Sequence, residues 1–177
     1  NASGLNTTGA NNTSLGYAAL YTTSTADNNT SIGYASLFAN STGADNTALG
    51  SSALYTNTTG ASNTGIGKRA LYANTTGANN VGVGDKAREN GTTGSSNVCL
   101  GYAAGDLLTT GGSNIMIGTS VDPAANDNTN AIVIGMGITG ESNDFSFGKA
   151  SNVVTNDFNA DADWGRSSDV RLKDNIQ

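Results

Sequence analysis

Residues 29–33 read NTSIG, and this short phrase decides the fold because it returns throughout the chain. Its pattern is Asn, two variable residues, an aliphatic residue and Gly. The glycine recurs every 17 residues without one insertion, at Gly16, Gly33, Gly50, Gly67, Gly84, Gly101, Gly118 and Gly135. A period kept over eight units predicts a repeat protein in which each unit stacks on the next.

Other positions keep the same period. The residue before each glycine is always aliphatic. The third residue after the first six glycines is small, and an Asn stands four places before each of the first seven. Seventeen residues are too few for a helical hairpin, and the density of Gly, Asn and Thr opposes helix. The sequence therefore predicts an all-β fold, a parallel β-solenoid with 17-residue coils at the inter-strand spacing of about 4.8 Å.

Each column has an expected role in such a coil. We expect the aliphatic residue before each glycine to point inward and form a continuous apolar spine. Gly should supply a positive φ or a close backbone approach. Asn should tolerate the left-handed conformation and bond its copies in neighbouring coils as a ladder.

The composition excludes several classes of function. The chain of 177 residues carries a formal charge of −6 and has no basic patch, so we expect no nucleic-acid partner. It has no apolar run of about 20 residues, so we expect no membrane insertion. With no His and a single Cys, Cys99, we expect no metal site, no cofactor and no conventional catalysis.

The repeat does not fill the chain. It spans residues 1–138 and decays over 139–166, a segment with the apolar residues Val153, Val154, Phe158 and Trp164. We interpret that segment as a neck in which several chains pack, with a structureless linker as the alternative. The early coils offer few large apolar side chains, so association through one face would stabilise them.

One column changes character midway. Five residues after the glycine, the first coils carry Tyr21, Phe38, Tyr55 and Tyr72, and the next two carry Glu89 and Asp106. Packing or subunit contact is one interpretation of the aromatic column. The other is a glycan-binding site in which the rings stack on sugars.

A Ser/Thr–Thr pair also recurs, usually followed by Gly, as in Thr58–Thr59 and Thr75–Thr76. Regular Thr ranks suggest an ice-binding solenoid, but only one Thr of each pair can face outward from a strand. The simpler expectation is side-chain hydrogen bonding at a bend.

The end of the chain differs from the rest. Residues 168–176 read SDVRLKDNI. They resemble the start of the intramolecular chaperone domain at the C-terminus of phage endosialidases, tail spikes and tail fibres. The resemblance implies a domain that assembles a trimer and then cuts itself away, with Ser168 as nucleophile and Lys173 as its base. Because that domain extends well beyond this motif, we expect residues 167–177 to be a truncated and inert start of it.

The repeats are similar to the head repeats of trimeric autotransporter adhesins, although their period is longer. Together the two resemblances imply a homotrimeric tail fibre of a phage or phage-like machine, located on the virion outside the cell. Its role would be to present or contact the host surface, through a polysaccharide or protein receptor. The alternative is a trimeric adhesin on a bacterial surface, and ice binding is the third hypothesis.

Overall fold

The computed structural model describes residues 2 and 4–157, and within them it contains twelve β-strands and no helix. The first six strands are three residues long, because a bend follows each of them at the repeated glycine. The strands are β1 (Thr13–Leu15), β2 (Thr30–Ile32), β3 (Thr47–Leu49), β4 (Thr64–Ile66), β5 (Val81–Val83), β6 (Val98–Leu100), β7 (Ile115–Thr119), β8 (Asp122–Pro123), β9 (Ile132–Met136), β10 (Thr139–Gly140), β11 (Asp144–Lys149) and β12 (Asn152–Asp157).

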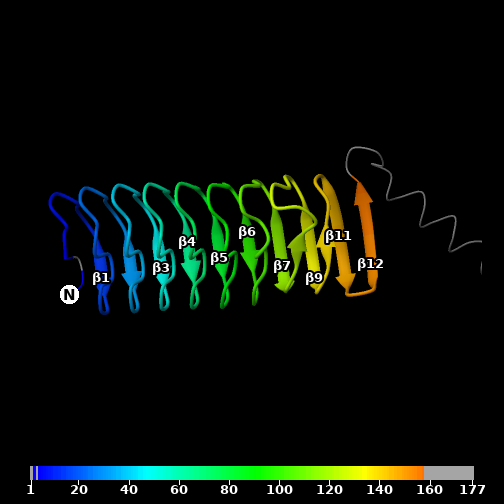
Figure 1. The fold of residues 1–177 in the computed structure, drawn as a ribbon, viewed down its shortest axis with the longest axis horizontal. Helices are drawn as coiled ribbons and strands as arrows, with labels where there is room; N and C mark the ends of the chain where they lie inside the picture. The colour runs from blue at the N-terminus through cyan, green and yellow to red at the C-terminus, as the bar shows by residue number, and fades with distance from the viewer. Residues whose placement is uncertain (1, 3, 158–177) are drawn as a thin grey trace, which may run out of the picture.

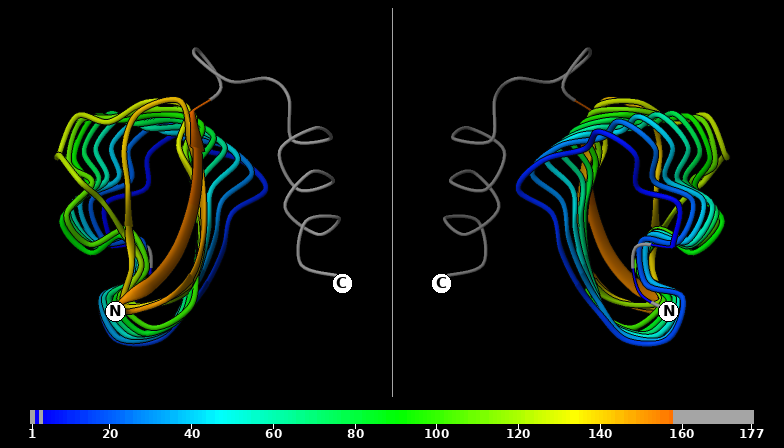
Figure 2. Two further views of the ribbon diagram at one scale, coloured as in Figure 1. Left: turned by 90° about the vertical axis from the view of Figure 1, so that its right-hand side faces the viewer. Right: turned by 90° about the vertical axis from the view of Figure 1, so that its left-hand side faces the viewer.

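Ten of these strands form one sheet that runs the length of the solenoid, in the order β1-β2-β3-β4-β5-β6-β7-β9-β11-β12 (Figure 1). Neighbouring coils pair in parallel with a register of 17, for example Thr30 with Thr47 and Ile32 with Leu49. Seen end-on, the coils follow nearly the same path (Figure 2). The expected parallel β-solenoid with 17-residue coils is confirmed.

The glycine column sets how closely the coils approach. Gly67 has φ 126° and Gly84 has φ 135°, in the region that L side chains rarely adopt. A Cβ on Gly67 would overlap the backbone carbonyl of Gly84 in the next coil. The expectation of a positive φ and a close approach is confirmed, since both requirements meet at the same residue.

The repeated Asn forms the expected ladder inside the coils. Asn63 Oδ1 accepts hydrogen bonds from the backbone N–H of Asn80 at 3.0 Å and from its Nδ2 at 3.1 Å. Asn80 Nδ2 also donates to Gly94 O at 2.9 Å. These side chains are fully buried, so the ladder satisfies their polar atoms where water does not reach.

The left-handed conformation, however, belongs to other columns than the expected one. The residue before each ladder Asn has it, as in Asn28 (φ 58°) and Asn79 (φ 59°). More unexpectedly, so do the buried leucines of the bend after the strand, such as Leu37 (φ 46°) and Leu54 (φ 52°). Their backbone N–H groups donate to the next coil, Leu37 to Ala53 O at 2.9 Å, and this contact holds the bend.

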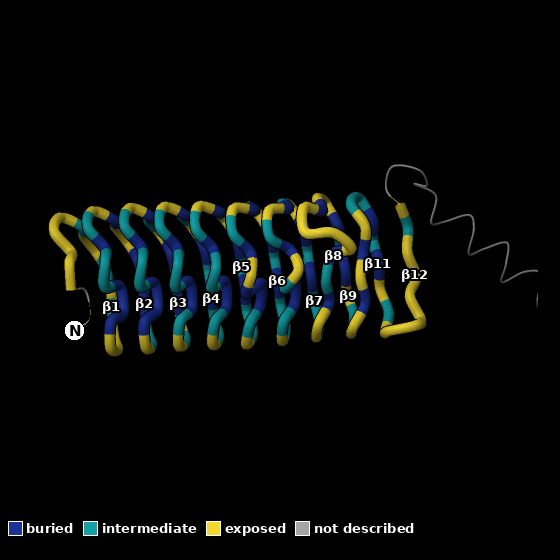
Figure 3. Tube along the Cα trace, in the orientation of Figure 1, coloured by how far each residue is buried: buried dark blue, intermediate teal, exposed yellow. Residues whose placement is uncertain are grey.

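The prediction that the aliphatic column points inward is wrong. Leu15 is 66% exposed and Leu49 is 44% exposed, and the other members before Gly135 lie at the surface, half-buried or exposed. In β2–β7 and β9 the inward residue is the second one of the strand, as with Ala48 and Met116, which are both fully buried. Figure 3 shows how burial varies along the coils. Alternation along a three-residue strand sends both flanking residues outward together.

The outer face of the sheet therefore carries two rows of side chains, which we call the outer rows. In β1–β4 one row is Thr and the other is Leu or Ile, whereas in β5, β6, β7 and β9 both are aliphatic. The interior is filled from elsewhere. Leu20, Leu37, Leu54 and Leu71 come from the bends, and a second cluster in the later coils includes Met116, Val121, Val133 and Ile138.

The last coil is shorter than the others. Phe145 of β11 pairs with Ile132 of β9, a register of 13, and β12 then turns back antiparallel to β11. The sheet thus continues past residue 138, where the sequence suggested that the repeat ends. Val153 and Val154 lie in β12, whereas Phe158 and Trp164, the other expected anchors of the neck, fall outside the described residues.

Candidate functional site: an aromatic groove over the first coils

The aromatic column predicted from the sequence is a continuous stack. Tyr21, Phe38, Tyr55 and Tyr72 lie one above another, with ring centroids 5.1–5.6 Å apart and interplanar angles of 4–10°. Each ring follows the previous one by one coil, so the solenoid itself imposes the spacing. We call these four residues the inner stack.

Both ends of the inner stack are covered. At one end the backbone of Gly4 lies against Tyr21, since a Cβ there would be 2.5 Å from Tyr21 Cε2. At the other end the guanidinium of Arg69 lies over Tyr72, 4.5 Å from the ring centroid. The flat faces of these rings therefore meet each other or the protein, and they present edges and hydroxyl groups sideways.

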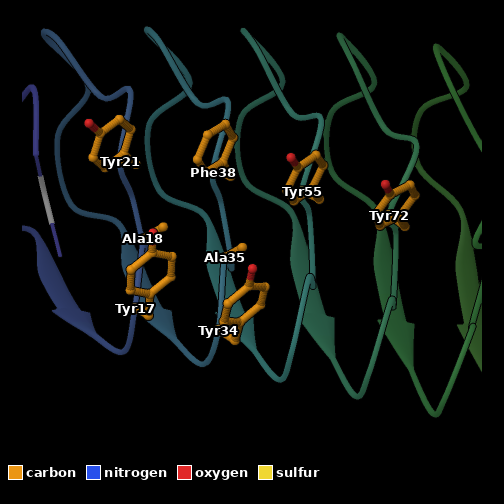
Figure 4. Close-up of a pocket in the computed structure, with 8 residues that line it drawn as sticks. All are labelled: Tyr17, Ala18, Tyr21, Tyr34, Ala35, Phe38, Tyr55 and Tyr72. Atoms are coloured by element: carbon orange, nitrogen blue, oxygen red, sulfur yellow. The ribbon is translucent and has the colours of Figure 1, made fainter. Parts of the chain in front are cut away.

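A second aromatic row lies beside the first. Tyr17 and Tyr34, the residues directly after two of the repeated glycines, stack with centroids 5.5 Å apart and are 67% and 60% exposed. A groove of about 700 Å³ runs between the two rows (Figure 4). Ala18 and Ala35 lie between the rows and form its floor.

Sequence reasoning missed this second row. Its signal was the position directly after the glycine, which reads Tyr, Tyr, Ser, Lys, Asp, Tyr along the coils. The groove thus brings together all four predicted aromatic residues and two that were not predicted. None of its eight lining residues carries a charge, and five are tyrosines.

Charged residues replace the inner stack in the later coils. Glu89 follows Tyr72 in the column and pairs with Arg69 at 2.6 Å and with Lys86 at 3.8 Å. Burial raises the pKa of the Asp106 carboxyl, and the nearby negative charge of Glu89 raises it further. Burial likewise raises the pKa of Asp122, whose Oδ1 accepts a hydrogen bond from the Leu107 N–H at 2.9 Å.

The interior of the fifth coil departs from the pattern of its neighbours. Arg88 stands in the column of buried leucines and is itself fully buried, and Gly91 stands where Asn40, Asn57 and Asn74 form a second internal ladder. Arg88 Nη2 donates to Gly94 O at 3.2 Å, the bond that Asn74 Nδ2 makes to Gly77 O in the preceding coil. The guanidinium thus occupies the space of the missing amide.

This exchange leaves polar atoms without partners among the described residues: Asn74 Oδ1 and Arg88 Nε and Nη1. Burial lowers the pKa of Arg88, because the charged form loses its hydration. Burial also raises the pKa of the Cys99 thiol to about 12, although the charge of Arg88 opposes the shift.

The Ser/Thr–Thr pairs form hydrogen bonds at the bend, as expected. Thr58 Oγ1 donates to Thr75 O at 3.0 Å, and Ser41 Oγ donates to Thr58 O at 2.9 Å. The second residue of a pair, such as Thr59 or Thr76, is exposed. One Thr of each pair therefore joins two coils and the other faces solvent.

Within residues 2 and 4–157, no three His, Cys, Asp or Glu side chains lie close enough together to bind a metal ion. In the same residues, no helix is long and apolar enough to cross a membrane. Ser168 and Lys173, the self-cleavage residues implied by resemblance, lie outside it. Comparison of the chain with protein families, curated proteins and solved structures finds no match.

Proposed function

We propose that this chain is a structural segment of a homotrimeric fibre on a phage or phage-like tail, which attaches the particle to a host cell surface. The observation that carries the proposal is the outer face of the ten-stranded sheet, with its two outer rows. The SDVRLKDNI motif supports the phage assignment over a bacterial adhesin, through its resemblance to the chaperone domain of tail fibres.

The outer rows favour contact between copies of the chain. In β5, β6, β7 and β9 they consist only of Val, Leu and Ile, and no charged side chain interrupts them. Nine parallel strands at about 4.8 Å make a strip roughly 40 Å long and about 10 Å wide. A strip of several hundred Å² is as large as the largest apolar patch on a typical monomer, and patches of this size are often functional.

Symmetry adds to the argument. A strip that runs parallel to the shaft can face the same strip of identical chains around one axis, which is the closed arrangement that homo-oligomers prefer. Burial of the outer rows would add to the stability of an interior in which the sheet itself contributes only small side chains, such as Ala48 and Ser31. The fibre would then be stabilised by association as well as by its own core.

Light scattering tests the proposal. The native chain should have a mass near three times 17.7 kDa, and Ile117→Asp in β7 should shift it to the mass of one chain. Thr93→Asp adds the same charge on an exposed bend and should leave the mass unchanged. Leu49→Asp, at a residue already 44% exposed, provides a second variant in case Ile117→Asp does not fold.

A native chain that is a monomer at micromolar concentration would contradict the trimer. If both Ile117→Asp and Leu49→Asp remain trimers, and circular dichroism shows that their strand content is unchanged, the contact between subunits does not lie in the outer rows. Dissociation by Thr93→Asp as well would show that added charge alone separates the chains.

A further inference from the structure

The two aromatic rows end differently, and this difference leaves one ring face open. The inner stack continues for four coils and is covered at both ends. The outer pair Tyr17–Tyr34 stops after two coils, because the same position in the third coil is Ser51. The third coil lies directly on this segment, with the Ser52 N–H donating to Tyr34 O at 2.8 Å.

Tyr17 covers one face of the Tyr34 ring. The opposite face points along the solenoid axis toward the third coil, where Ser51 stands in place of a third tyrosine. Phe38 and Tyr55 present their edges from the other wall of the groove, and Ala35 forms the floor (Figure 4). The result is a flat apolar platform beside a hydroxyl group, open to solvent and bounded by ring edges.

The lining determines which ligands fit. It combines aromatic rings, alanine methyl groups and phenol hydroxyls, and it contains no charged side chain. Such a surface suits an uncharged molecule with an apolar C–H face for the ring and hydroxyl groups on its rim. A pyranose sugar has both, and a groove of about 700 Å³ holds a short oligosaccharide.

We propose that the groove is a binding subsite for an uncharged oligosaccharide, in which one pyranose ring stacks on the open face of Tyr34 above Ser51. The inference rests on the proposed attachment role, for which it names the ligand class. It also changes the expected mode of binding, since the sugar uses the outer pair as its platform and the inner stack as a wall.

Saturation-transfer NMR and calorimetric titration of the whole chain test the subsite, with maltotriose, cellotriose and triacetylchitotriose as probes at up to about 10 mM. At least one probe should bind and show transfer from tyrosine ring protons. Tyr34→Ala should weaken its binding about tenfold, the loss expected for one stacked aromatic ring. Failure of all three probes to bind would overturn the proposal.

Two variants separate the platform from a general aromatic effect. Ser51→Tyr should abolish binding without removing any ring, because it continues the outer stack and covers the open face of Tyr34. Tyr102→Ala removes a tyrosine of the same column that is also exposed, three coils beyond Ser51, and should leave binding unchanged. Unaltered binding in Ser51→Tyr, or an equal loss in Tyr102→Ala, would contradict the assignment.

The mass of the Tyr34→Ala variant shows whether the groove binds sugar or forms a contact between subunits of the proposed trimer. An unchanged mass with weakened sugar binding supports the subsite, whether the native chain is a trimer or a monomer. A fall in mass would show that the groove is a contact between subunits, and the sugar subsite would then be rejected.

Discussion

Replacing Arg88 with Leu and Gly91 with Asn together should stabilise the solenoid, although one of these changes alone should destabilise it. Both restore the residue types of the three preceding coils. The new Asn could donate to Asn74 Oδ1, which lacks a partner among the described residues, and to Gly94 O. The buried guanidinium, with two unpartnered nitrogens, would be removed.

The magnitudes follow from the space around residue 91. A Cβ on Gly91 would lie 2.5–2.6 Å from Arg88 Nε and Nη1, so Gly91→Asn alone should destabilise by about 2 kcal/mol through overpacking. Gly91 does not need its glycine for a left-handed backbone, because its φ is not positive. The cost is therefore steric.

Arg88→Leu alone should stay within about 1 kcal/mol of the native chain, since loss of a buried charge offsets the cavity and the unsatisfied Gly94 carbonyl. The double variant should gain about 1 kcal/mol. The coupling energy between the two sites is then about 3 kcal/mol, the upper end for residues in contact.

Urea unfolding followed by circular dichroism measures all four chains, at one protein concentration because association contributes to stability. A transplant to the fourth coil is the control: Asn74→Gly should partly rescue Leu71→Arg. Effects that add within about 0.5 kcal/mol, or a Gly91→Asn chain as stable as the native one, would refute the proposed exchange of guanidinium for amide.

Three further predictions concern single residues. Cys99 should resist a thiol reagent at pH 8 in the folded chain and react fully in denaturant, because burial raises its pKa to about 12. Asp122→Asn keeps an oxygen for the Leu107 N–H and should raise the melting temperature at pH 7 by about 1–2 °C. The gain should vanish as the pH falls below 3.8, since the raised pKa means that Asp122 contributes stability only when protonated and loses it as the pH rises. Gly67→Ala should destabilise by about 3 kcal/mol or more, whereas Gly137→Ala, with φ 62° and open space, should cost about 1 kcal/mol in thermal unfolding.

Each of these has a contrary outcome. Rapid labelling of Cys99 without denaturant would show that the interior opens readily. An Asp122→Asn effect that does not vary with pH would assign its benefit to packing. Equal destabilisation by Gly67→Ala and Gly137→Ala would show that the glycine column is required for its positive φ alone, and that the close approach of the coils adds nothing.

The sequence predicted the period, the parallel stacking and the Asn ladder because each depends on identical residues meeting their copies. It failed on the direction of the aliphatic column. In a three-residue strand, either the two flanking residues or the middle residue can point inward. The flanking residues are the more hydrophobic ones, so hydrophobicity favours the wrong alternative here. The interior accepts Ser31 and Gly65 at the second position of the strand because the bend leucines already fill it, and it accepts Met116 where Gly105 stands in the bend-leucine column.

Those leucines were not predictable from local preference, since a left-handed backbone is unfavourable for Leu and is imposed by burial and by the bond to the next coil. For the site, the spacing of Tyr21 and Phe38 predicted the stack. The groove needed the second row, whose position relative to the first depends on the bend after each glycine. The Arg88–Gly91 exchange can be recognised only from the folded coil, in which the guanidinium of Arg88 occupies the space of the amide that Gly91 lacks.

The glycine contact between coils also bears on how such a shaft changes during evolution. Since each coil meets the next through the same backbone approach, gain or loss of 17 residues by unequal recombination between near-identical repeats preserves every column on both sides of the junction. The length of the solenoid can then change in steps of about 4.8 Å without compensating substitutions in the core. An insertion of one residue acts only on the coil that carries it, because the coils on either side keep their own period of 17 and the extra residue must be accommodated in a bend or a bulge, as the 13-residue step from β9 to β11 shows for a deletion.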